Sequence, residues 1–201
     1  MAIFVLVPGG DGRSSFWDQV APLLEAKGHR VHTPTLADQT TSTLTDHIAQ
    51  VSVLVEDAGT GTNDVILVGH SYGGVIITGV SGTVHHRVRR LIYLDTVYPS
   101  DGVSLFDHFA QSGVDPASFD GLEPFPSLVE PLRYDVEAWR SIPKTYVHCT
   151  GSEFLSLTAH EIPLVQARLL QDNWEYDELD SGHVCMFDEP DQTAAILMRH
   201  A

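Results

Sequence analysis

Cysteine, basic residues and long apolar runs are all scarce in this sequence of 201 residues. The two cysteines, Cys149 and Cys185, are too few for a disulfide framework, and we expect both to be buried thiols. Eleven Lys and Arg against 27 Asp and Glu give a net charge of −16, which argues against a nucleic-acid partner. No apolar run approaches the roughly 18 residues that cross a bilayer, so no membrane segment is expected.

The amino-terminal stretch "MAIFVLVPGG" has no basic region, and its apolar run is too short for a signal peptide. We therefore expect a buried strand there and a cytoplasmic location. The eleven histidines are scattered, without a helical His-x-x-x-His pair beside a carboxylate, so no metal site is predicted. The sequence leaves open whether the protein is a monomer or a homodimer.

Apolar periodicity alternates between strand and helix patterns along most of the chain. The pattern predicts strands at 3–7, 30–33, 64–68, 89–95, 144–149 and 174–180, and helices at 14–27, 41–58, 72–82, 159–171 and 190–200. This alternation is typical of one α/β domain over residues 1–201, with a doubly wound, mostly parallel sheet. The periodicity is lost over about 97–142, which is proline-rich. We expect a small cap insertion there, over the carboxyl ends of the strands, where such sheets bind ligands.

The stretch "DVILVGHSYGGVII", residues 64–77, places one serine between glycines where a predicted strand meets a predicted helix. A serine on such a sharp turn has a strained backbone, and the residues two positions before and after it must be very small. Gly69 and Gly73 stand at those positions around Ser71. The pattern predicts a nucleophile elbow with Ser71 as the nucleophile, and its alternative is a glycine-rich helix start with an incidental serine.

A serine hydroxyl is a poor nucleophile at neutral pH and needs a base within hydrogen-bonding reach. In an elbow architecture the chain order is Ser, acid, His, with the His on a loop after the last strand. The segment "SGHVC" places His183 there. His70, immediately before Ser71, is instead expected to pack beneath the turn.

An oxyanion hole requires backbone N–H groups that are already in place when negative charge develops. We predict one from Tyr72, directly after the nucleophile, and one from Gly10 in the loop "VPGGDGRSSFW". Glycines let this loop approach a ligand closely. A flexible turn before a helix would have the same composition, and composition alone does not separate the two.

Several segments resemble successive signatures of the α/β-hydrolase superfamily, and the resemblance covers essentially the whole chain. They are "FVLVPGG", "VILVGHSYGGVIITGV", "RRLIYLDTVYPSDG" and "SGHVCMFDEP". The closest resemblance is to the small esterase and hydroxynitrile-lyase-like branch. Two departures matter: the first loop reads Pro8-Gly9 where the family usually has His-Gly, and the chain is shorter than usual, which implies a small cap.

The resemblance leaves the acid of the triad open. The family commonly places an Asp after the strand ending at Cys149, and there this chain has Ser152 with Glu153 beside it. Parts of the superfamily carry the acid at the end of the preceding strand, where Asp95 follows an apolar run. We predict Asp95 as the acid and keep Glu153 as the alternative. Asp95 could also serve only to brace the entrance of the cap.

The resemblance implies a serine hydrolase that cleaves a small or aromatic carboxylic ester through an acyl-enzyme on Ser71, without a cofactor. A small-molecule ester would be its partner. The alternatives are a hydroxynitrile-lyase-like carbon–carbon lyase and a non-catalytic small-molecule-binding protein. The lyase branch has a Lys after the catalytic His and a Thr in the oxyanion loop. This chain has Val184 and Gly9 at those positions, which counts against a lyase. The Ser–His pair counts against a pure binder.

The predicted cap offers apolar side chains that could form the substrate pocket. We expect Phe106, Phe109, Leu122 and Phe125 to bind substrate, and Phe119 belongs to the same group. These side chains could equally form the core of the cap itself.

Overall fold

The computed structural model describes residues 1–201 except 11, 60, 62–63, 120–121 and 169–172. Its centre is a six-stranded parallel sheet with the strand order β2-β1-β3-β4-β5-β6. The strands are β1 (Ile3–Val7), β2 (Arg30–His32), β3 (Val65–His70), β4 (Val88–Leu94), β5 (Lys144–Cys149) and β6 (Trp174–Leu179). The predicted parallel α/β architecture is confirmed.

The strand order places a topological switch point between β1 and β3. The chain leaves β1 for β2 on one side and then returns to β3 on the other side. Val5 of β1 pairs with Leu67 of β3, and Val7 pairs with Gly69, so both strands end at the same edge. The loops that follow β1 and β3 are therefore neighbours at the position where open α/β sheets bind ligands.

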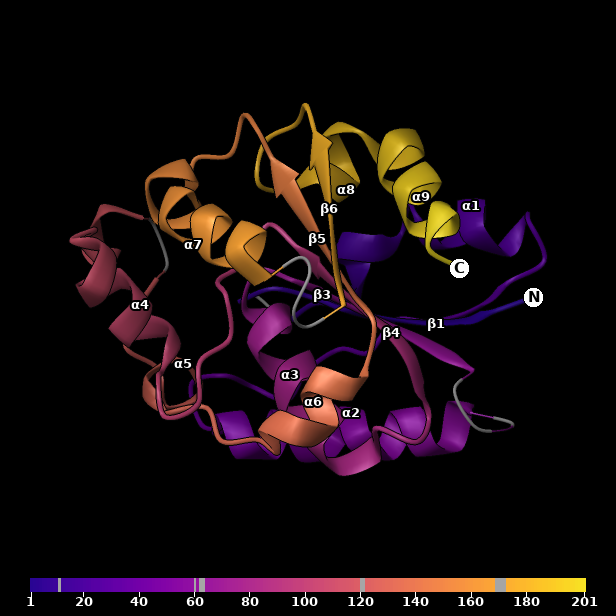
Figure 1. Cartoon of the computed structure of the whole chain (residues 1–201), viewed down its shortest axis with the longest axis horizontal. Helices are drawn as coiled ribbons and strands as arrows, with labels where there is room; N and C mark the ends of the chain where they lie inside the picture. Colours follow the sequence, from indigo (N-terminus) through magenta and orange to yellow (C-terminus); the bar gives the residue numbers. More distant parts are fainter. Residues whose placement is uncertain (11, 60, 62–63, 120–121, 169–172) are drawn as a thin grey trace.

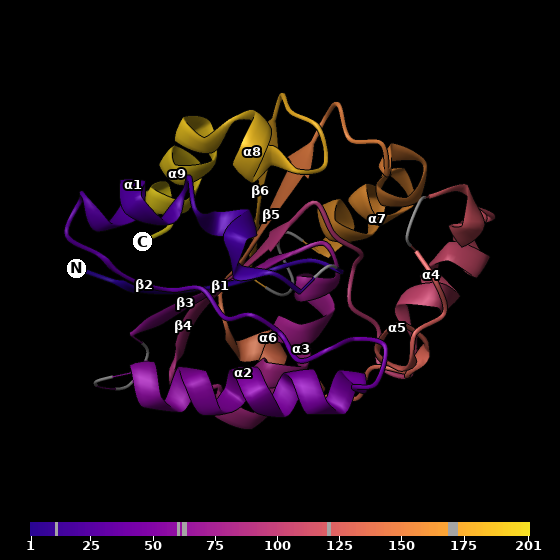
Figure 2. The same cartoon turned by 180° about the vertical axis from the view of Figure 1, so that it is seen from behind.

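Helices cover both faces of the sheet (Figures 1 and 2). On one face α2 (Leu44–Ala58) packs on α3 (Tyr72–Val84), and on the other α1 (Ala21–Glu25) packs on α9 (Pro190–Arg199). Two apolar clusters fill the two interfaces, and β1, β3 and β5 are buried along their whole length. The remaining elements are η1 (Ser14–Trp17), α4 (Leu105–Ser112), η2 (Pro116–Ser118), α5 (Pro126–Val129), α6 (Val136–Ser141), α7 (Leu155–Arg168) and α8 (Cys185–Asp188).

The segment expected to form the cap divides between two places. Helices α4 and α5 contact each other, and α4 also packs on α7. Helix α6 packs against α3 instead, on the face that α2 covers (Figure 1). Within the described part of 97–142, α4 thus contacts α7, α5 contacts both α4 and α2, and α6 contacts α3.

Two predicted helices differ from those in the structure. The helix expected over 14–27 is broken: η1 ends at Trp17 and α1 begins at Ala21, because Pro22 lacks an N–H and suits the first turn of a new helix. The helix expected over about 159–171 begins at Leu155, and the last part of that prediction, 169–171, lies outside the described residues. The backbone N–H of Phe154 donates to Oγ of Ser152, which starts the first turn earlier.

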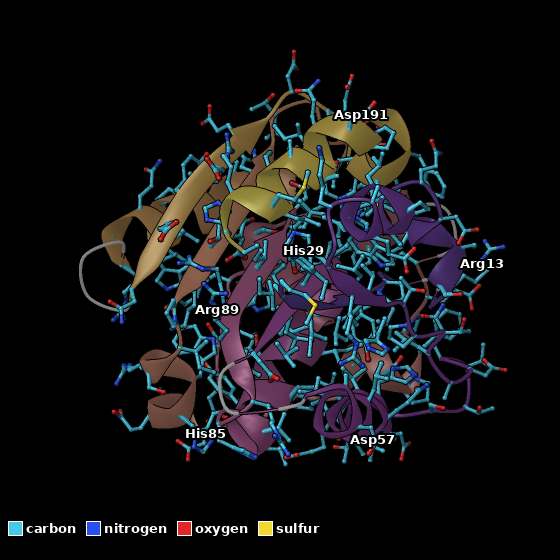
Figure 3. All side chains as sticks on the ribbon, turned by 90° about the vertical axis from the view of Figure 1, so that its right-hand side faces the viewer. Arg13, His29, Asp57, His85, Arg89 and Asp191 are labelled. Atoms are coloured by element: carbon cyan, nitrogen blue, oxygen red, sulfur yellow. The ribbon has the colours of Figure 1, made fainter. Side chains whose placement is uncertain are left out.

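Many charged side chains lie on the surface of the molecule, whereas Asp95, Lys144 and Glu161 are buried. Figure 3 shows Arg13, Asp57 and Asp191 on the outside, together with Arg89 and His85, and all five are exposed. Within the described ranges, no helix has the length and apolar character needed to cross a membrane.

Candidate active site

Ser71 stands on a strained turn between β3 and α3. Its φ of 52° and ψ of −125° lie outside the regions that a residue with a side chain normally adopts. The two flanking glycines are required by close contact. A Cβ on Gly73 would lie 2.7 Å from the carbonyl oxygens of Val7 and Pro8, and one on Gly69 would overlap the backbone of Gly73. The turn thus has the geometry expected of a nucleophile elbow.

Thr96, two residues after the end of the neighbouring strand β4, braces this turn. Its hydroxyl donates to the backbone carbonyl of Ser71 at 2.5 Å, while its own carbonyl accepts from the hydroxyl of Tyr146. A Cβ on Gly74 would lie 2.5 Å from Oγ1 of Thr96, so this close approach is possible only because residue 74 is a glycine.

His183 and Asp95 form a buried pair beside the turn. Nδ1 of His183 lies 2.6 Å from Oδ2 of Asp95, and the carboxylate is fully removed from solvent. Asp95 follows β4 with a φ of 45°, and Cys149, at the end of β5, donates its backbone N–H to Oδ1. Since β4 and β5 are adjacent, an acid at either strand end could have reached this imidazole.

Three consecutive residues after β5 each support a different part of this pair. The hydroxyl of Ser152 donates to Oδ2 of Asp95 at 2.5 Å. The carboxylate of Glu153 accepts from the backbone N–H of His183 at 3.0 Å, and the ring of Phe154 lies 4.4 Å from the imidazole, centroid to centroid. Glu153, the alternative acid, therefore holds the backbone of the His loop, and Asp95 contacts the imidazole.

Backbone donors lower the pKa of the Glu153 carboxyl below its usual range. Its own N–H contributes most and that of His183 adds to it. The group is consequently an anion near neutral pH, which suits an acceptor that anchors a loop.

His70 lies beneath the site and is not a base. Its Nε2–H donates to the backbone carbonyl of His183 at 2.8 Å, and its ring centroid lies 4.6 Å from that of the other imidazole. Burial and the neighbouring His183 lower the pKa of His70 to about 3, so the ring stays neutral. The sequence predicts that His70 packs beneath the turn, and the structure adds that it holds the backbone of the loop that carries His183.

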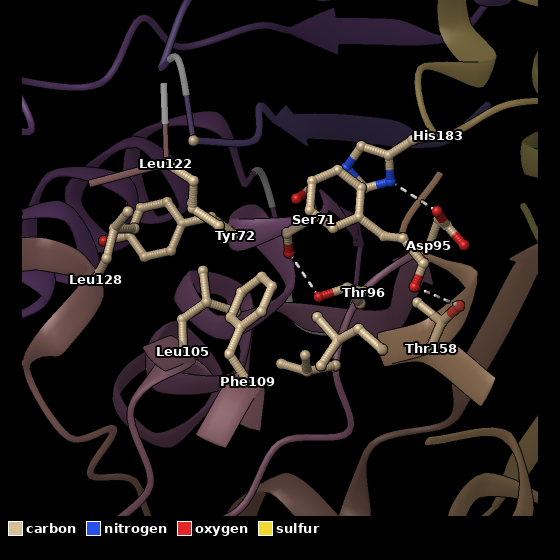
Figure 4. A pocket seen from close by; sticks show the side chains of 14 residues that line it. Ser71, Tyr72, Asp95, Thr96, Leu105, Phe109, Leu122, Leu128, Thr158 and His183 are labelled. Carbon is tan, nitrogen blue, oxygen red and sulfur yellow. Dashed lines mark hydrogen bonds and ion pairs between the residues drawn. The ribbon is translucent and has the colours of Figure 1, made fainter. Parts of the chain in front are cut away.

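Two spaces open onto Ser71 and His183. The first is a cavity of about 50 Å³ that also reaches Asp95, Thr96 and Phe109 (Figure 4). The second is a groove of about 420 Å³ that continues past Gly9, Phe16 and Gln39. Gly10 lines both spaces, in agreement with a place near a reacting carbonyl.

The expected oxyanion donors come from two neighbouring loops. Tyr72 is the first residue of α3, and the N–H groups in the first turn of a helix have no acceptor within that helix. Gly10 follows β1, and a Cβ added to it would meet no atom within 4 Å, so the space in front of this residue is open. The hydroxyl of Tyr72 points away and pairs with Nδ1 of His47 at 2.9 Å.

Two of the four expected substrate-binding residues line these spaces. Phe109 lines the cavity, and Leu122 lines both cavity and groove. Phe106 and Phe125 line neither of these two spaces; they pack against the larger apolar cluster, as Phe109 and Leu122 also do, and a role for them in substrate binding stays a prediction. Spacing along an aperiodic segment does not reveal which side of a short helix faces the site.

A sequence model of the alpha/beta hydrolase family matches residues 4–196. The chain belongs to the alpha/beta hydrolase family. Two relatives of this alpha/beta hydrolase match over part of its length. It is 41% identical over 114 residues to the carbendazim hydrolyzing esterase of Nocardioides sp. (strain SG-4G), which covers 52% of this chain and 46% of the relative. It is 32% identical over 106 residues to the pyrethroid hydrolase of Sphingobium wenxiniae, with 50% and 38% covered. The matches thus span less than half of either relative.

The fold of this alpha/beta hydrolase is also found in solved structures. An extracellular alpha/beta-hydrolase from a Paenibacillus species superposes with a TM-score of 0.80 at 24% identity, over 100% of this chain and 99% of the other. At this identity the likeness concerns the fold alone.

Several residues that line the site of this alpha/beta hydrolase could not be predicted from the sequence. Phe154, Leu157 and Thr158 all line the cavity, yet none belongs to a segment that resembles a family signature. Ser152 has a weak signal, because it occupies the position after β5 where the family resemblance implies an acid. Its contact with Asp95 depends on the pairing of β4 with β5.

Proposed function

We propose that this protein is a serine esterase that hydrolyses a small-molecule carboxylic ester through an acyl-enzyme on Ser71. One observation carries the proposal: Ser71, on its strained turn, shares a cavity with an imidazole that is paired at 2.6 Å with the buried carboxylate of Asp95. A nucleophile, a base and a group that orients the base are the parts that acyl transfer needs.

In the first half-reaction Oγ of Ser71 attacks the ester carbonyl, and Nε2 of His183 takes the hydroxyl proton. Asp95 holds Nδ1–H of the imidazole, which fixes the tautomer and stabilises the cation that forms. The N–H groups of Tyr72 and Gly10 would receive the oxyanion. The bond to the alcohol oxygen then breaks, His183 returns the proton to that oxygen, and the alcohol leaves.

In the second half-reaction water attacks the acyl-enzyme. His183 removes a proton from the water, the bond between the acyl carbon and Oγ breaks, and the proton returns to Ser71. The acid product leaves, and no step requires a metal or an organic cofactor.

The surroundings of the imidazole favour hydrolysis over lyase chemistry. Val184 follows His183 and contributes an apolar side chain to the groove, so it offers no charge to a cyanide ion. The names of the two partial relatives, an esterase and a hydrolase, add support for hydrolysis.

The decisive experiment measures hydrolysis of p-nitrophenyl acetate by the wild-type protein and by Ser71→Ala. We expect turnover in the wild type and a loss of at least about 10³-fold in kcat for the variant. Ser156→Ala, at an exposed serine of α7, is the matched control and should retain activity. A fluorophosphonate should label Ser71. Absence of turnover in the wild type, or unchanged turnover in Ser71→Ala, would reject the proposal.

The same proposal includes a cytoplasmic location. Cys149 and Cys185 are both buried, free thiols, and a reducing compartment keeps such thiols unpaired. Cell fractionation followed by immunodetection tests the location, and recovery of the protein outside the cytoplasmic fraction would contradict it.

A further inference from the structure

The space around Ser71 is divided into two compartments of very different size. The cavity holds about 50 Å³ and the groove about 420 Å³, and Ser71 and His183 border both. A single water requires roughly 10–15 Å³ on this measure, so the cavity has room for only a few atoms of that size.

Part of the cavity wall is formed by buried, apolar side chains. Leu105, Phe109 and Leu157 are each no more than 8% exposed, and Val97 is 2% exposed. The hydroxyl of Thr158, beside them, donates to the carbonyl of Phe154. The cavity therefore suits a short apolar group, and these walls leave little room for a longer one.

The groove has half-buried, largely aromatic walls. Phe119 and Phe154 stack with their ring centroids 4.1 Å apart and planes inclined by 14°, and Phe16 lies on the groove as well. Val184 and the side-chain amide of Gln39 also border the groove. All five side chains are partly open to solvent, and of these five only Phe154 also lines the cavity. Flat aromatic faces of this kind pack well against a flat, apolar ring system.

The chemistry of acyl transfer decides which half of an ester enters which compartment. The alcohol oxygen must lie within reach of His183, which borders both compartments, so this requirement is met in either one. The alcohol must also leave while the acyl group is still bound to Ser71, so it requires the compartment that faces solvent. The acyl group stays behind and can occupy the smaller cavity, against the buried side chains of Leu105, Phe109 and Leu157.

We propose that this protein prefers esters of a short acyl group, of about two to four carbons, with a bulky aromatic alcohol. The acyl group occupies the cavity and the alcohol occupies the groove. Attack by Ser71 forms the bond from Oγ to the acyl carbon, the bond to the alcohol oxygen breaks, and that oxygen takes the proton from His183. This inference rests on the proposed esterase function.

A pair of isomeric esters tests the assignment directly. In 2-naphthylmethyl acetate the ring system belongs to the alcohol, and in methyl 2-naphthylacetate it belongs to the acid. Both leaving groups are primary alcohols of similar basicity, so intrinsic reactivity differs little. We expect kcat/KM for the acetate to exceed that for the methyl ester by at least tenfold. Equal values, or a preference for the methyl ester, would overturn the assignment.

Acyl chain length gives a second, independent measurement. With p-nitrophenyl acetate, butyrate and octanoate, kcat/KM should stay within a few-fold up to butyrate and fall at least tenfold at octanoate. Leu157→Ala enlarges the cavity and should restore part of the octanoate activity. Leu164→Ala is the matched control, because Leu164 lies on the same helix but is 51% exposed.

The outcomes separate this inference from the proposed function. Failure to hydrolyse any ester, p-nitrophenyl acetate included, would reject the esterase itself. Hydrolysis of p-nitrophenyl acetate together with equal or higher activity on the octanoate would leave the esterase intact and reject the small acyl cavity. The wild-type series decides this even if Leu157→Ala does not fold.

Discussion

The hydroxyl of Ser152 lies 2.5 Å from Oδ2 of Asp95 and donates a hydrogen bond to it. The same carboxylate oxygen also accepts from Nδ1 of His183, so this one oxygen accepts two hydrogen bonds. Ser152 stands after β5 and Asp95 after β4, and the pairing of these two strands brings them together. Ser152 thus supports the imidazole through Asp95, as a positioning residue.

We predict that Ser152→Ala lowers kcat by about tenfold and leaves KM within about twofold. A hydrogen bond to a charged group contributes about 1.5–3 kcal/mol, and part of that should be lost from the orientation of the imidazole. Steady-state kinetics on p-nitrophenyl acetate would measure both constants. Ser156→Ala, exposed and four residues further along, should change neither. A large rise in KM with kcat intact would contradict a positioning role.

Substitutions of the two candidate acids, Asp95 and Glu153, should reduce kcat by very different factors. Asp95→Asn should reduce kcat by roughly 10⁴-fold, because the amide cannot hold the imidazole in the required tautomer or stabilise its cation. Glu153→Gln should cost no more than about tenfold, because this side chain only accepts from the backbone N–H of His183. The opposite ranking would move the acid to Glu153.

The contact between Ser152 and Asp95 also allows a rescue experiment. In the double variant Asp95→Asn, Ser152→Asp, the carboxylate that pairs with His183 would come from residue 152, after β5, in place of residue 95. Asn is a suitable replacement because it tolerates the positive φ of 45° at residue 95. We expect kcat at least about tenfold above that of Asp95→Asn alone. A double variant no better than Asp95→Asn would show that the second strand end does not place a carboxylate within reach.

Adding a single methyl group at Gly69, beside the strained turn, should lower the stability of the protein. Gly69→Ala places a Cβ against the backbone of Gly73 and 2.7 Å from the N of Gly74, where no flexible side chain can give way. We expect a loss of about 3 kcal/mol in the free energy of unfolding, measured by urea denaturation. Gly10→Ala meets no atom within 4 Å and should change stability little. Equal stability of the two variants would contradict the close packing of the turn.

Acid should destabilise the protein partly through His70. In the folded protein the pKa of His70 is lowered to about 3 by burial and by His183, whereas the unfolded chain takes up this proton near pH 6.5. Protons therefore favour the unfolded state as the pH falls from about 6.5 toward 3. This one group should cost at most about 2 kcal/mol between pH 6.5 and pH 5.

The test for this prediction is urea unfolding of wild type and His70→Gln at pH 6.5 and pH 5. Gln can keep a donor near the carbonyl of His183 but takes up no proton, so the variant should lose less stability on acidification. His85→Gln, at an exposed histidine, is the matched control. Identical pH dependence in wild type and His70→Gln would contradict a neutral, buried His70.

Local patterns in the sequence were enough to predict the fold, the turn that carries Ser71 and the position of His183 after the last strand. Buried strands such as β3 are continuous apolar runs, and the elbow requires glycines that must follow one another in the chain. Cap residues were predicted less well. Phe109 faces the cavity and Phe106 does not, although both lie on α4, because the direction of a short helix depends on its neighbours.

The sequence by itself determined the parallel sheet, the strained turn at Ser71 and the position of His183 after the last strand, because each depends on residues close together in the chain. Only the tertiary structure decided the partners of Asp95, the support from Ser152 and Thr96, and the division of the site into a small cavity and a wide groove. These contacts join residues from different strands, 25 to 88 positions apart in the chain. Their distances are set by strand pairing and side-chain packing, which short-range patterns do not specify.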